Sequence, residues 1–92
     1  MWGRMIEKVY VIKNRLGLHA RAAAQLVQLA NRFKADVLVR KDGLEVNGKS
    51  IMGILMLAAP RGSRIEVSVR GDDATEAMAA IGELIDDGFG ED

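Results

Sequence analysis

The single histidine, His19, is the strongest candidate for chemistry in this 92-residue sequence, which contains no cysteine. It follows the break Gly17-Leu18 and directly precedes Ala20, where apolar residues begin to recur at helical spacing. We therefore expect His19 at or beside the N-cap of a helix, where free backbone N–H groups and the helix dipole favour an anion. A neutral imidazole with one free ring nitrogen is a nucleophile, so this position permits a histidine that carries a phosphoryl group.

Two neighbours of His19 have the chemistry to hold phosphate oxygens. The backbone N–H groups of Ala20 and Arg21 fall in the first helical turn, and the Arg21 guanidinium supplies a charge-assisted contact. For an arbitrary histidine at such a position, a plain helix cap beside a solvated arginine is the more common arrangement. The surrounding motif has to decide between these two interpretations.

Composition excludes several other classes of protein. The sequence is 49% hydrophobic and 28% charged, which is typical of a globular domain and not of a disordered chain. One histidine and no cysteine leave no set of imidazoles or thiolates for a metal, so we expect neither a metal nor a cofactor. No apolar stretch approaches the roughly 20 residues that cross a bilayer, and no signal peptide is evident, so we expect a cytoplasmic protein without membrane insertion.

The charges are divided along the chain although the net charge is zero. Residues 1–49 hold ten Lys and Arg against four Asp and Glu, and residues 50–92 hold three against nine. The zero net charge argues against sequence-independent binding of nucleic acid. The division fits solvated surfaces on separate elements or a basic docking face, and charge alone does not choose between them.

Hydrophobic periodicity predicts the elements that must position His19. Apolar alternation and β-branched runs indicate strands over 6–12, 37–41, 44–46 and 64–70. Helical spacing indicates a helix from Ala20 whose last periodic residue is Phe33, a short helix over 51–56, and a last helix that ends near Gly88. Asp42-Gly43 predicts a type I′ hairpin turn, and Asp73 to Glu76 form an acidic variant of the capping box.

This order, β-α-β-β-α-β-α, predicts the fold class. Strands with one wet face favour an antiparallel sheet, and amphipathic helices can cover its other face. We expect an α+β, two-layer open-faced sandwich in which three helices cover one face of a four-stranded antiparallel sheet. No linker or repeat interrupts the chain, so residues 1–92 are expected to form one domain, and their number suggests a monomer.

Two motifs resemble those of a known family. Gly17-Leu18-His19-Ala20-Arg21 is similar to the active-site signature of HPr, the histidine-containing phosphocarrier protein family of the bacterial phosphoenolpyruvate:sugar phosphotransferase system, and of its nitrogen-related paralogue. Lys49-Ser50-Ile51-Met52-Gly53 resembles the family's regulatory-serine motif, and the element order is the family's over about residues 5–88. Residues 1–4 precede the resemblance and are expected to be an N-terminal extension, to which we assign no function.

The resemblance implies a phosphocarrier. His19 would accept a phosphoryl group on Nδ1 from enzyme I charged by phosphoenolpyruvate, and would donate it to an enzyme IIA domain in sugar uptake and its regulation. It implies a carrier rather than an independent catalyst, because a labile P–N bond has only to be positioned. It also implies a serine kinase/phosphorylase that modifies Ser50, adding negative charge that repels an acidic partner. Ser50 is expected to be the N-cap of the short helix in any case.

The short helix after Ser50 predicts a docking surface. A helix of this length cannot bury its whole apolar perimeter, so we expect Ile54 and Leu57 to be buried and Ile51 and Met52 to be exposed. An apolar patch ringed by Arg21, Lys49 and Arg15 would suit an acidic partner. The expected partner contacts are Arg15, Lys49, Ile51, Met52 and Leu55.

One residue departs from the family pattern: Ala22 stands where proline is common. Alanine favours the helix and restores an N–H donor, while the loop before it loses the rigidity of a proline. We expect the helix start to be retained, and phosphotransfer rate or partner preference to differ from that of Ala22→Pro.

Other interpretations remain open. The serine motif resembles the sugar branch of the family, whereas Asn14-Arg15-Leu16 and the tail 88–92 resemble the nitrogen-related branch, which acts in regulation rather than sugar transport. A hydrolase using His19 with Ser50, Ser63 or Ser68 lacks a nucleophile-elbow motif. A module for single-stranded RNA would need more aromatic residues than the 4% present, of which Trp2 and Tyr10 form no stacking platform.

Overall fold

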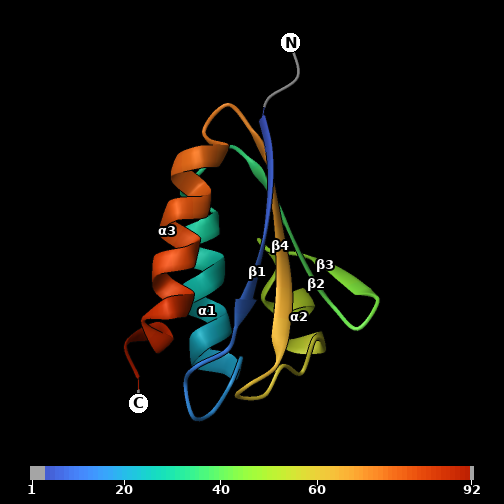
Figure 1. Ribbon diagram of the computed structural model, residues 1–92, viewed down its shortest axis with the longest axis vertical. Helices are drawn as coiled ribbons and strands as arrows, with labels where there is room; N and C mark the ends of the chain where they lie inside the picture. Colours follow the sequence, from blue (N-terminus) through green and yellow to red (C-terminus); the bar gives the residue numbers. More distant parts are fainter. Residues whose placement is uncertain (1–3, 92) are drawn as a thin grey trace.

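Four strands and three α-helices follow one another in the predicted order in the computed structural model, which describes residues 4–91 (Figure 1). None of these helices has the length and hydropathy of a membrane-spanning segment. The elements are β1 (Arg4–Val11), α1 (Ala20–Ala30), β2 (Asp36–Lys41), β3 (Leu44–Asn47), α2 (Ile51–Met56), β4 (Arg64–Gly71), α3 (Ala74–Asp86) and the 3-10 turn η1 (Gly88–Gly90).

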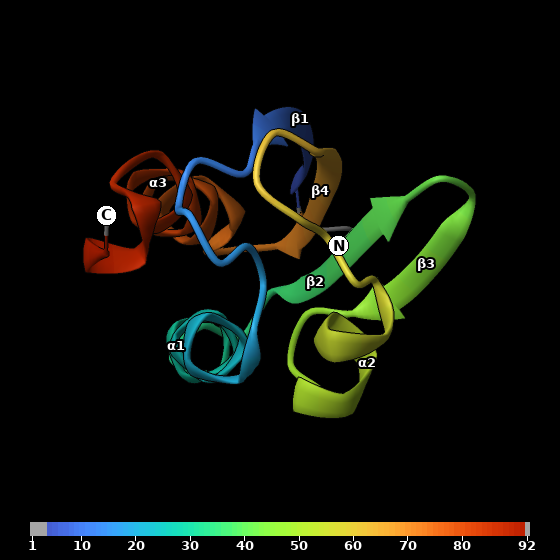
Figure 2. The ribbon, with the colours of Figure 1, turned by 90° about the horizontal axis from the view of Figure 1, so that it is seen from below.

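The four strands form one antiparallel sheet in the order β1-β4-β2-β3. The β2–β3 hairpin turns at Asp42 and Gly43, whose φ angles of 50° and 84° are those of the predicted type I′ turn. All three helices lie against the same face of the sheet, and the other face is open (Figures 1 and 2). The predicted α+β open-faced sandwich is therefore confirmed.

The core lies between the sheet and the helices because one side of each element is apolar. Alternate residues of β4, Ile65, Val67 and Val69, are fully buried and face the helix layer. Ile81 and Ile85 of α3 are fully buried in the same cluster, together with apolar residues of α1 and α2. Burial of one such side chain stabilises the fold by about 1.5–3 kcal/mol, so this packing holds the start of α1 in place.

Two elements differ in extent from the sequence pattern. Helix α1 ends at Ala30, because the N–H groups of Arg32 and Phe33 donate to carbonyls three residues back and tighten the chain. Strand β1 begins at Arg4, two residues before the predicted start at residue 6, and Arg4 pairs with Gly71 of β4. Residues 1–3 of the expected extension lie outside the described residues.

The predicted capping box at α3 is wrong. Asp73 is the N-cap residue, but its side chain makes no hydrogen bond to the helix. Its two carboxylate oxygens instead accept from the backbone N–H groups of Lys34 and Ala35, each at 2.9 Å. The hydrogen bonds from these two backbone N–H groups hold the pKa of the Asp73 carboxyl below its ordinary value, and the bond from Lys34 contributes most. The carboxylate thereby ties the start of α3 to the loop between α1 and β2.

Candidate functional site

His19 is the N-cap residue of α1, as predicted. Its backbone is extended, and its side chain makes no capping hydrogen bond. The first intrahelical bond runs from the N–H of Ala23 to the His19 carbonyl at 2.8 Å, so the N–H groups of Ala20, Arg21 and Ala22 lie at the open start of the helix. The imidazole therefore stands beside the positive end of the α1 dipole.

Gly17 allows the loop before His19 to pack closely against the segment after α2. Its φ is +69°, and a Cβ atom there would lie 2.4 Å from the carbonyl oxygen of Ala59 and 2.9 Å from the Cα of Pro60. The next residue, Leu18, donates its N–H to the same Ala59 carbonyl at 2.9 Å. The position thus requires glycine both for its backbone angle and for the space.

Glu91 contacts the imidazole and was missed by the sequence analysis. Its carboxylate oxygens lie 2.9 and 3.1 Å from Nε2 of His19. Nδ2 of the fully buried Asn14 donates to Glu91 at 3.1 Å and to the Gly17 carbonyl at 2.7 Å. Hydrogen bonds from His19 and Asn14 hold the pKa of Glu91 below its ordinary value, and the positive charge of Arg21 adds to this effect.

The turn after α3 brings Glu91 to this position. Gly88, Phe89 and Gly90 all have positive φ angles, of 63°, 59° and 71°. Phe89 is buried in the core, which anchors the turn although a left-handed conformation is strained for this residue. The glycines on either side of Phe89 were a signal in the sequence, but they identify a turn and not the partner at its end.

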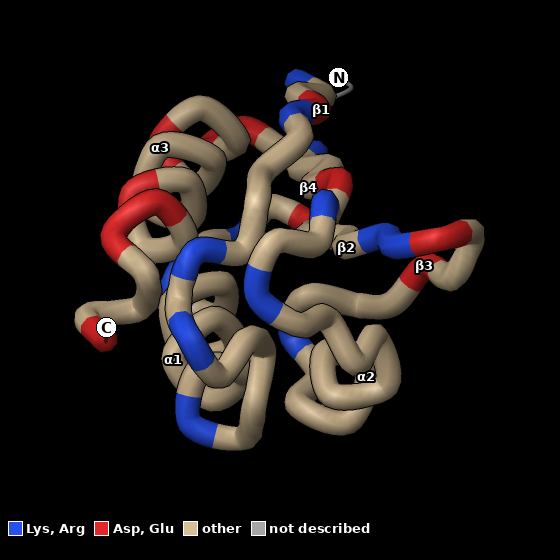
Figure 3. Tube along the Cα trace, turned by 60° about the horizontal axis from the view of Figure 1, so that its bottom comes forward, with Lys and Arg blue, Asp and Glu red and all other residues tan. Residues whose placement is uncertain are grey.

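A hollow of about 360 Å³ lies beside His19. Arg15 and Arg21 are exposed, and neither has an ion-pair partner among residues 4–91. Basic residues follow one another along the β1–α1 loop and the start of α1, whereas acidic residues gather on α3 (Figure 3). The hollow is lined by Arg15, Leu16, His19, Arg21, Gly90 and Glu91.

The exposed apolar residues of α2 are partly those predicted. Ile51 and Met52 are 44% and 73% exposed, while Ile54 and Leu57 are buried. The predicted contact Leu55 is half-buried and packs against the core. Met56 on α2 and Leu16 beside His19, which are not among the predicted contacts, are also exposed, at 63% and 59%.

Lys49 does not flank Arg15 and Arg21 as expected. Its ammonium donates at 2.8 Å to the carbonyl of Phe33, which lies beyond the C-terminal end of α1. An 11-residue helix is roughly 16 Å long, so Lys49 lies at the opposite end of α1 from His19. Ser50, next to it, is the N-cap of α2 as predicted, and its Oγ accepts from the N–H of Gly53 at 3.1 Å.

The geometry does not support a serine hydrolase. Ser50 bonds to its own helix, Ser63 donates to the Pro60 carbonyl, and Ser68 donates to Glu7 on the far face of the sheet. Among residues 4–91, no serine hydroxyl contacts His19, so no nucleophile and base are paired. The same residues contain no group of three or more His, Cys, Asp or Glu side chains that could hold a metal ion.

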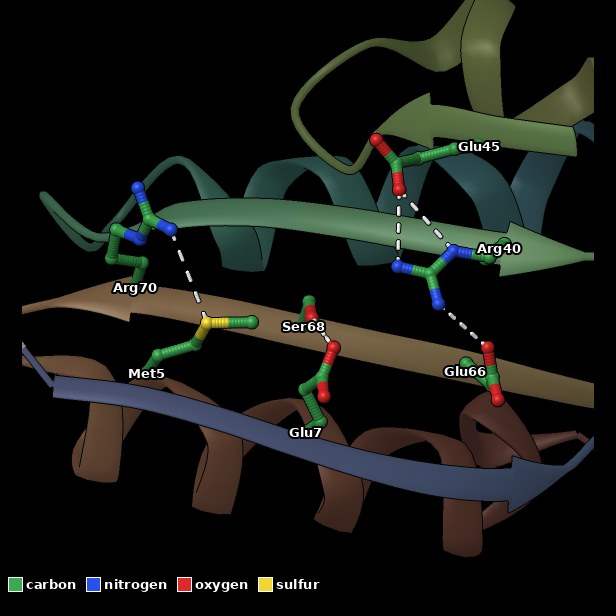
Figure 4. Close-up of polar contacts among 7 residues, drawn as sticks. All are labelled: Met5, Glu7, Arg40, Glu45, Glu66, Ser68 and Arg70. Atoms are coloured by element: carbon green, nitrogen blue, oxygen red, sulfur yellow. Dashed lines mark hydrogen bonds and ion pairs between the residues drawn. The ribbon is translucent and has the colours of Figure 1, made fainter.

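The open sheet face also does not suit single-stranded RNA. Its polar side chains bond to one another: Arg40 donates to Glu45 and Glu66, and the Ser68 hydroxyl donates to Glu7 (Figure 4). A depression of about 450 Å³ on this face contains no aromatic residue among those described. Tyr10 packs on the opposite side, against Gly82 of α3. The platform that stacks bases is therefore missing from the described residues.

Comparisons with known proteins agree with this geometry. The family model PTS-HPr, described as the PTS HPr component phosphorylation site, matches residues 6–87. The phosphocarrier protein HPr of Neisseria meningitidis serogroup A is 49% identical over 87 residues, which cover 95% of this chain and 98% of that protein. The HPr-like protein Crh of Halalkalibacterium halodurans is 48% identical over 77 residues, covering 84% and 92%. The crystal structure of HPr-C-His from Thermoanaerobacter tengcongensis superposes with a TM-score of 0.91 at 46% identity, covering 95% and 98%.

Proposed function

This chain belongs to the HPr phosphocarrier family of the phosphotransferase system, and on that premise we propose that His19 is the residue that carries the phosphoryl group. It accepts the group on Nδ1 from phosphoenolpyruvate-charged enzyme I and donates it to an enzyme IIA domain. One observation carries this proposal: His19 lies at the open N-terminus of α1, in a hollow shared with Arg15 and Arg21.

Nδ1 is the available nucleophile in this arrangement. Nε2 is engaged by Glu91, whereas Nδ1 has no hydrogen-bond partner within residues 4–91. The lone pair of Nδ1 forms the new P–N bond while the bond between phosphorus and the donor breaks, and the donor keeps that electron pair. The reverse exchange passes the group to the acceptor, so the carrier needs no further catalytic residue.

Positive groups around the hollow stabilise the phosphoryl oxygens. The N–H groups of Ala20 and Arg21 and the dipole of α1 favour an anion at this point. The guanidinium of Arg21 has no competing ion pair among the described residues and can turn to the oxygens. Arg15 adds positive charge at the rim, where it attracts an acidic partner surface.

Enzyme I and enzyme IIA domains dock on the exposed apolar residues beside this hollow. Leu16 adjoins His19, and α2 presents Ile51, Met52 and Met56. The two regions are continuous because Ala59, three residues after Met56, binds the N–H of Leu18. A serine kinase/phosphorylase modifies Ser50 at the start of α2, and the added charge opposes docking of an acidic partner.

We assign the sugar-uptake branch from the motif over residues 49–53. Transfer from the phosphorylated carrier to a sugar-type enzyme IIA domain tests this assignment. Faster transfer to a nitrogen-type IIA domain would reverse it and leave the role of His19 unaffected.

The test of the proposed function is intact mass after incubation with phosphoenolpyruvate, magnesium and a bacterial enzyme I. The expected result is a gain of one phosphoryl group that is lost in acid, because a phosphohistidine P–N bond is labile, and that is absent in His19→Ala. Enzyme I that charges a control carrier but leaves this protein unchanged would refute the proposal.

A further inference from the structure

We infer that Glu91 is a positioning residue for phosphoryl transfer: it holds the proton of His19 on Nε2 and balances the charge of the phosphorylated ring. This inference rests on the proposed role of His19 and adds a residue outside positions 6–87, which the family model matches. The geometry that carries it is the contact of both Glu91 oxygens with Nε2, at 2.9 and 3.1 Å.

The carboxylate is held in place from two sides. Asn14 is fully buried, and its amide N–H₂ group bridges Glu91 and the carbonyl of Gly17. On the other side, Phe89 anchors the turn that precedes Glu91 in the core. The Glu91 side chain itself is only 16% exposed. A carboxylate fixed in this way constrains the orientation of the imidazole ring.

The contact decides which ring nitrogen carries the proton. An ionised carboxylate only accepts hydrogen bonds, and the lowered pKa of Glu91 keeps it ionised at neutral pH. Nε2 must therefore be the donor, which leaves the lone pair of the neutral ring on Nδ1. That nitrogen is the one that has to attack phosphorus.

The same contact stabilises the phosphorylated state. When Nδ1 bonds to phosphorus and Nε2 keeps its proton, the ring becomes an imidazolium, and Glu91 lies against its positive edge. On donation the P–N bond breaks, the electron pair returns to Nδ1, and the leaving group is a neutral imidazole. No proton has to move in either direction. Without Glu91 the Nε2 proton is more readily lost, and the leaving group becomes the poorer imidazolate.

Arg15 and Arg21 are the other charged groups that line the hollow. Both are cations, so they favour the phosphoryl group and disfavour the imidazolium. Glu91 is the anion of this hollow among the described residues, and removing it leaves the phosphorylated ring beside two positive charges.

Glu91→Ala separates this role from a purely structural one when Glu83→Gln serves as the matched control. Glu83 is an exposed acidic residue of α3 without a hydrogen bond to His19 among the described residues. We expect Glu91→Ala to accept phosphoryl groups from enzyme I about tenfold more slowly, the scale of one lost hydrogen bond to a charged group. Its phosphohistidine should also hydrolyse more slowly at neutral pH. Glu83→Gln should match the wild type in both.

Proton NMR of the unphosphorylated protein gives a readout that needs no partner. A downfield Nε2–H resonance of His19 should be visible in the wild type and in Glu83→Gln, and lost to exchange with water in Glu91→Ala. Persistence of that resonance in Glu91→Ala, or unchanged transfer and hydrolysis, would overturn the inference and leave the carrier function intact. A wild-type protein that enzyme I cannot charge would overturn both.

Discussion

Nε2 of His19 lies 2.9 Å from Oε2 of Glu91, although 72 residues separate them in the sequence. This contact joins the basic first half of the chain to its acidic second half at the one histidine. The carboxylate contacts one ring nitrogen only, because Nδ1 has no hydrogen-bond partner among residues 4–91.

Arg21→Ala should slow phosphoryl acceptance by about tenfold, because it removes a charge-assisted contact to the phosphoryl oxygens. Its effect on the free energy of unfolding should be within about 0.5 kcal/mol, as expected of an exposed surface residue. Arg32→Ala is the matched control, since Arg32 is exposed just beyond the other end of α1. Initial rates of charging by enzyme I measure the difference. Equal rates for the two variants would remove Arg21 from the site.

Gly17→Ala should lower the free energy of unfolding by about 1–3 kcal/mol and displace His19. The left-handed backbone disfavours alanine, and the new Cβ atom would lie 2.4 Å from the carbonyl oxygen of Ala59. Gly43→Ala provides the comparison: its φ is +84°, but a Cβ atom there has no neighbour within 4 Å. We expect Gly43→Ala to lower the free energy of unfolding by only about 1 kcal/mol and to accept phosphoryl groups from enzyme I as fast as the wild type does. Urea unfolding and charging rates test both variants, and similar losses in the two would contradict the role given to close packing.

Ser50 variants should separate its capping role from a charge at the same position. Ser50→Ala removes the acceptor for the Gly53 N–H and should lower the free energy of unfolding by about 1 kcal/mol without slowing transfer. Ser50→Asp keeps a good N-cap and should retain stability, while its charge weakens binding to acidic partners. Thermal unfolding and titration calorimetry with enzyme I give the two readouts. Stronger binding of enzyme I by Ser50→Asp than by Ser50→Ala would refute the predicted repulsion between a negative charge at position 50 and the acidic partner.

Met52→Glu should weaken partner binding while leaving stability unchanged, because the side chain is 73% exposed and would place a charge on the apolar docking surface. Met5→Glu makes the same change on the open sheet face, where Met5 is 55% exposed, and should bind enzyme I as the wild type does. Dissociation constants at low and moderate salt measure the effect. An equal loss of affinity in both variants would mean that docking is not confined to the α2 side.

Asp73 should contribute a pH-dependent part of the stability. Its pKa in the folded protein is below the ordinary value of 3.8, so its contribution is fully present above about pH 4 and is lost as the pH falls through the folded pKa. Asp73→Asn should therefore be less stable than the wild type at pH 7, and the difference should shrink as the pH falls below about 4. Asp72→Asn, which alters an exposed neighbour, is the control. Denaturant titrations from pH 2 to 7 would contradict this if the difference stayed constant.

Features set by near neighbours in the chain could be predicted from the sequence alone. The alternation of β4, the Asp42-Gly43 turn, the cap at Ser50 and the position of His19 before α1 depend on residues within about four positions of each other. The exposure of Met52 and the burial of Ile54 follow from the period of one helix. Family motifs then connected His19 with phosphate chemistry.

The partners of long or charged side chains were decided only by tertiary structure. Asp73 binds amides 38 and 39 positions away, Lys49 binds the Phe33 carbonyl, and Glu91 reaches back to His19. The chemistry of each of these side chains allows a hydrogen bond to many different groups. The packing of α1 and α3 on the sheet determines which of those groups comes within hydrogen-bond distance. Sequence therefore determined that the histidine stands at a helix start, and the fold determined which of its two nitrogens is free.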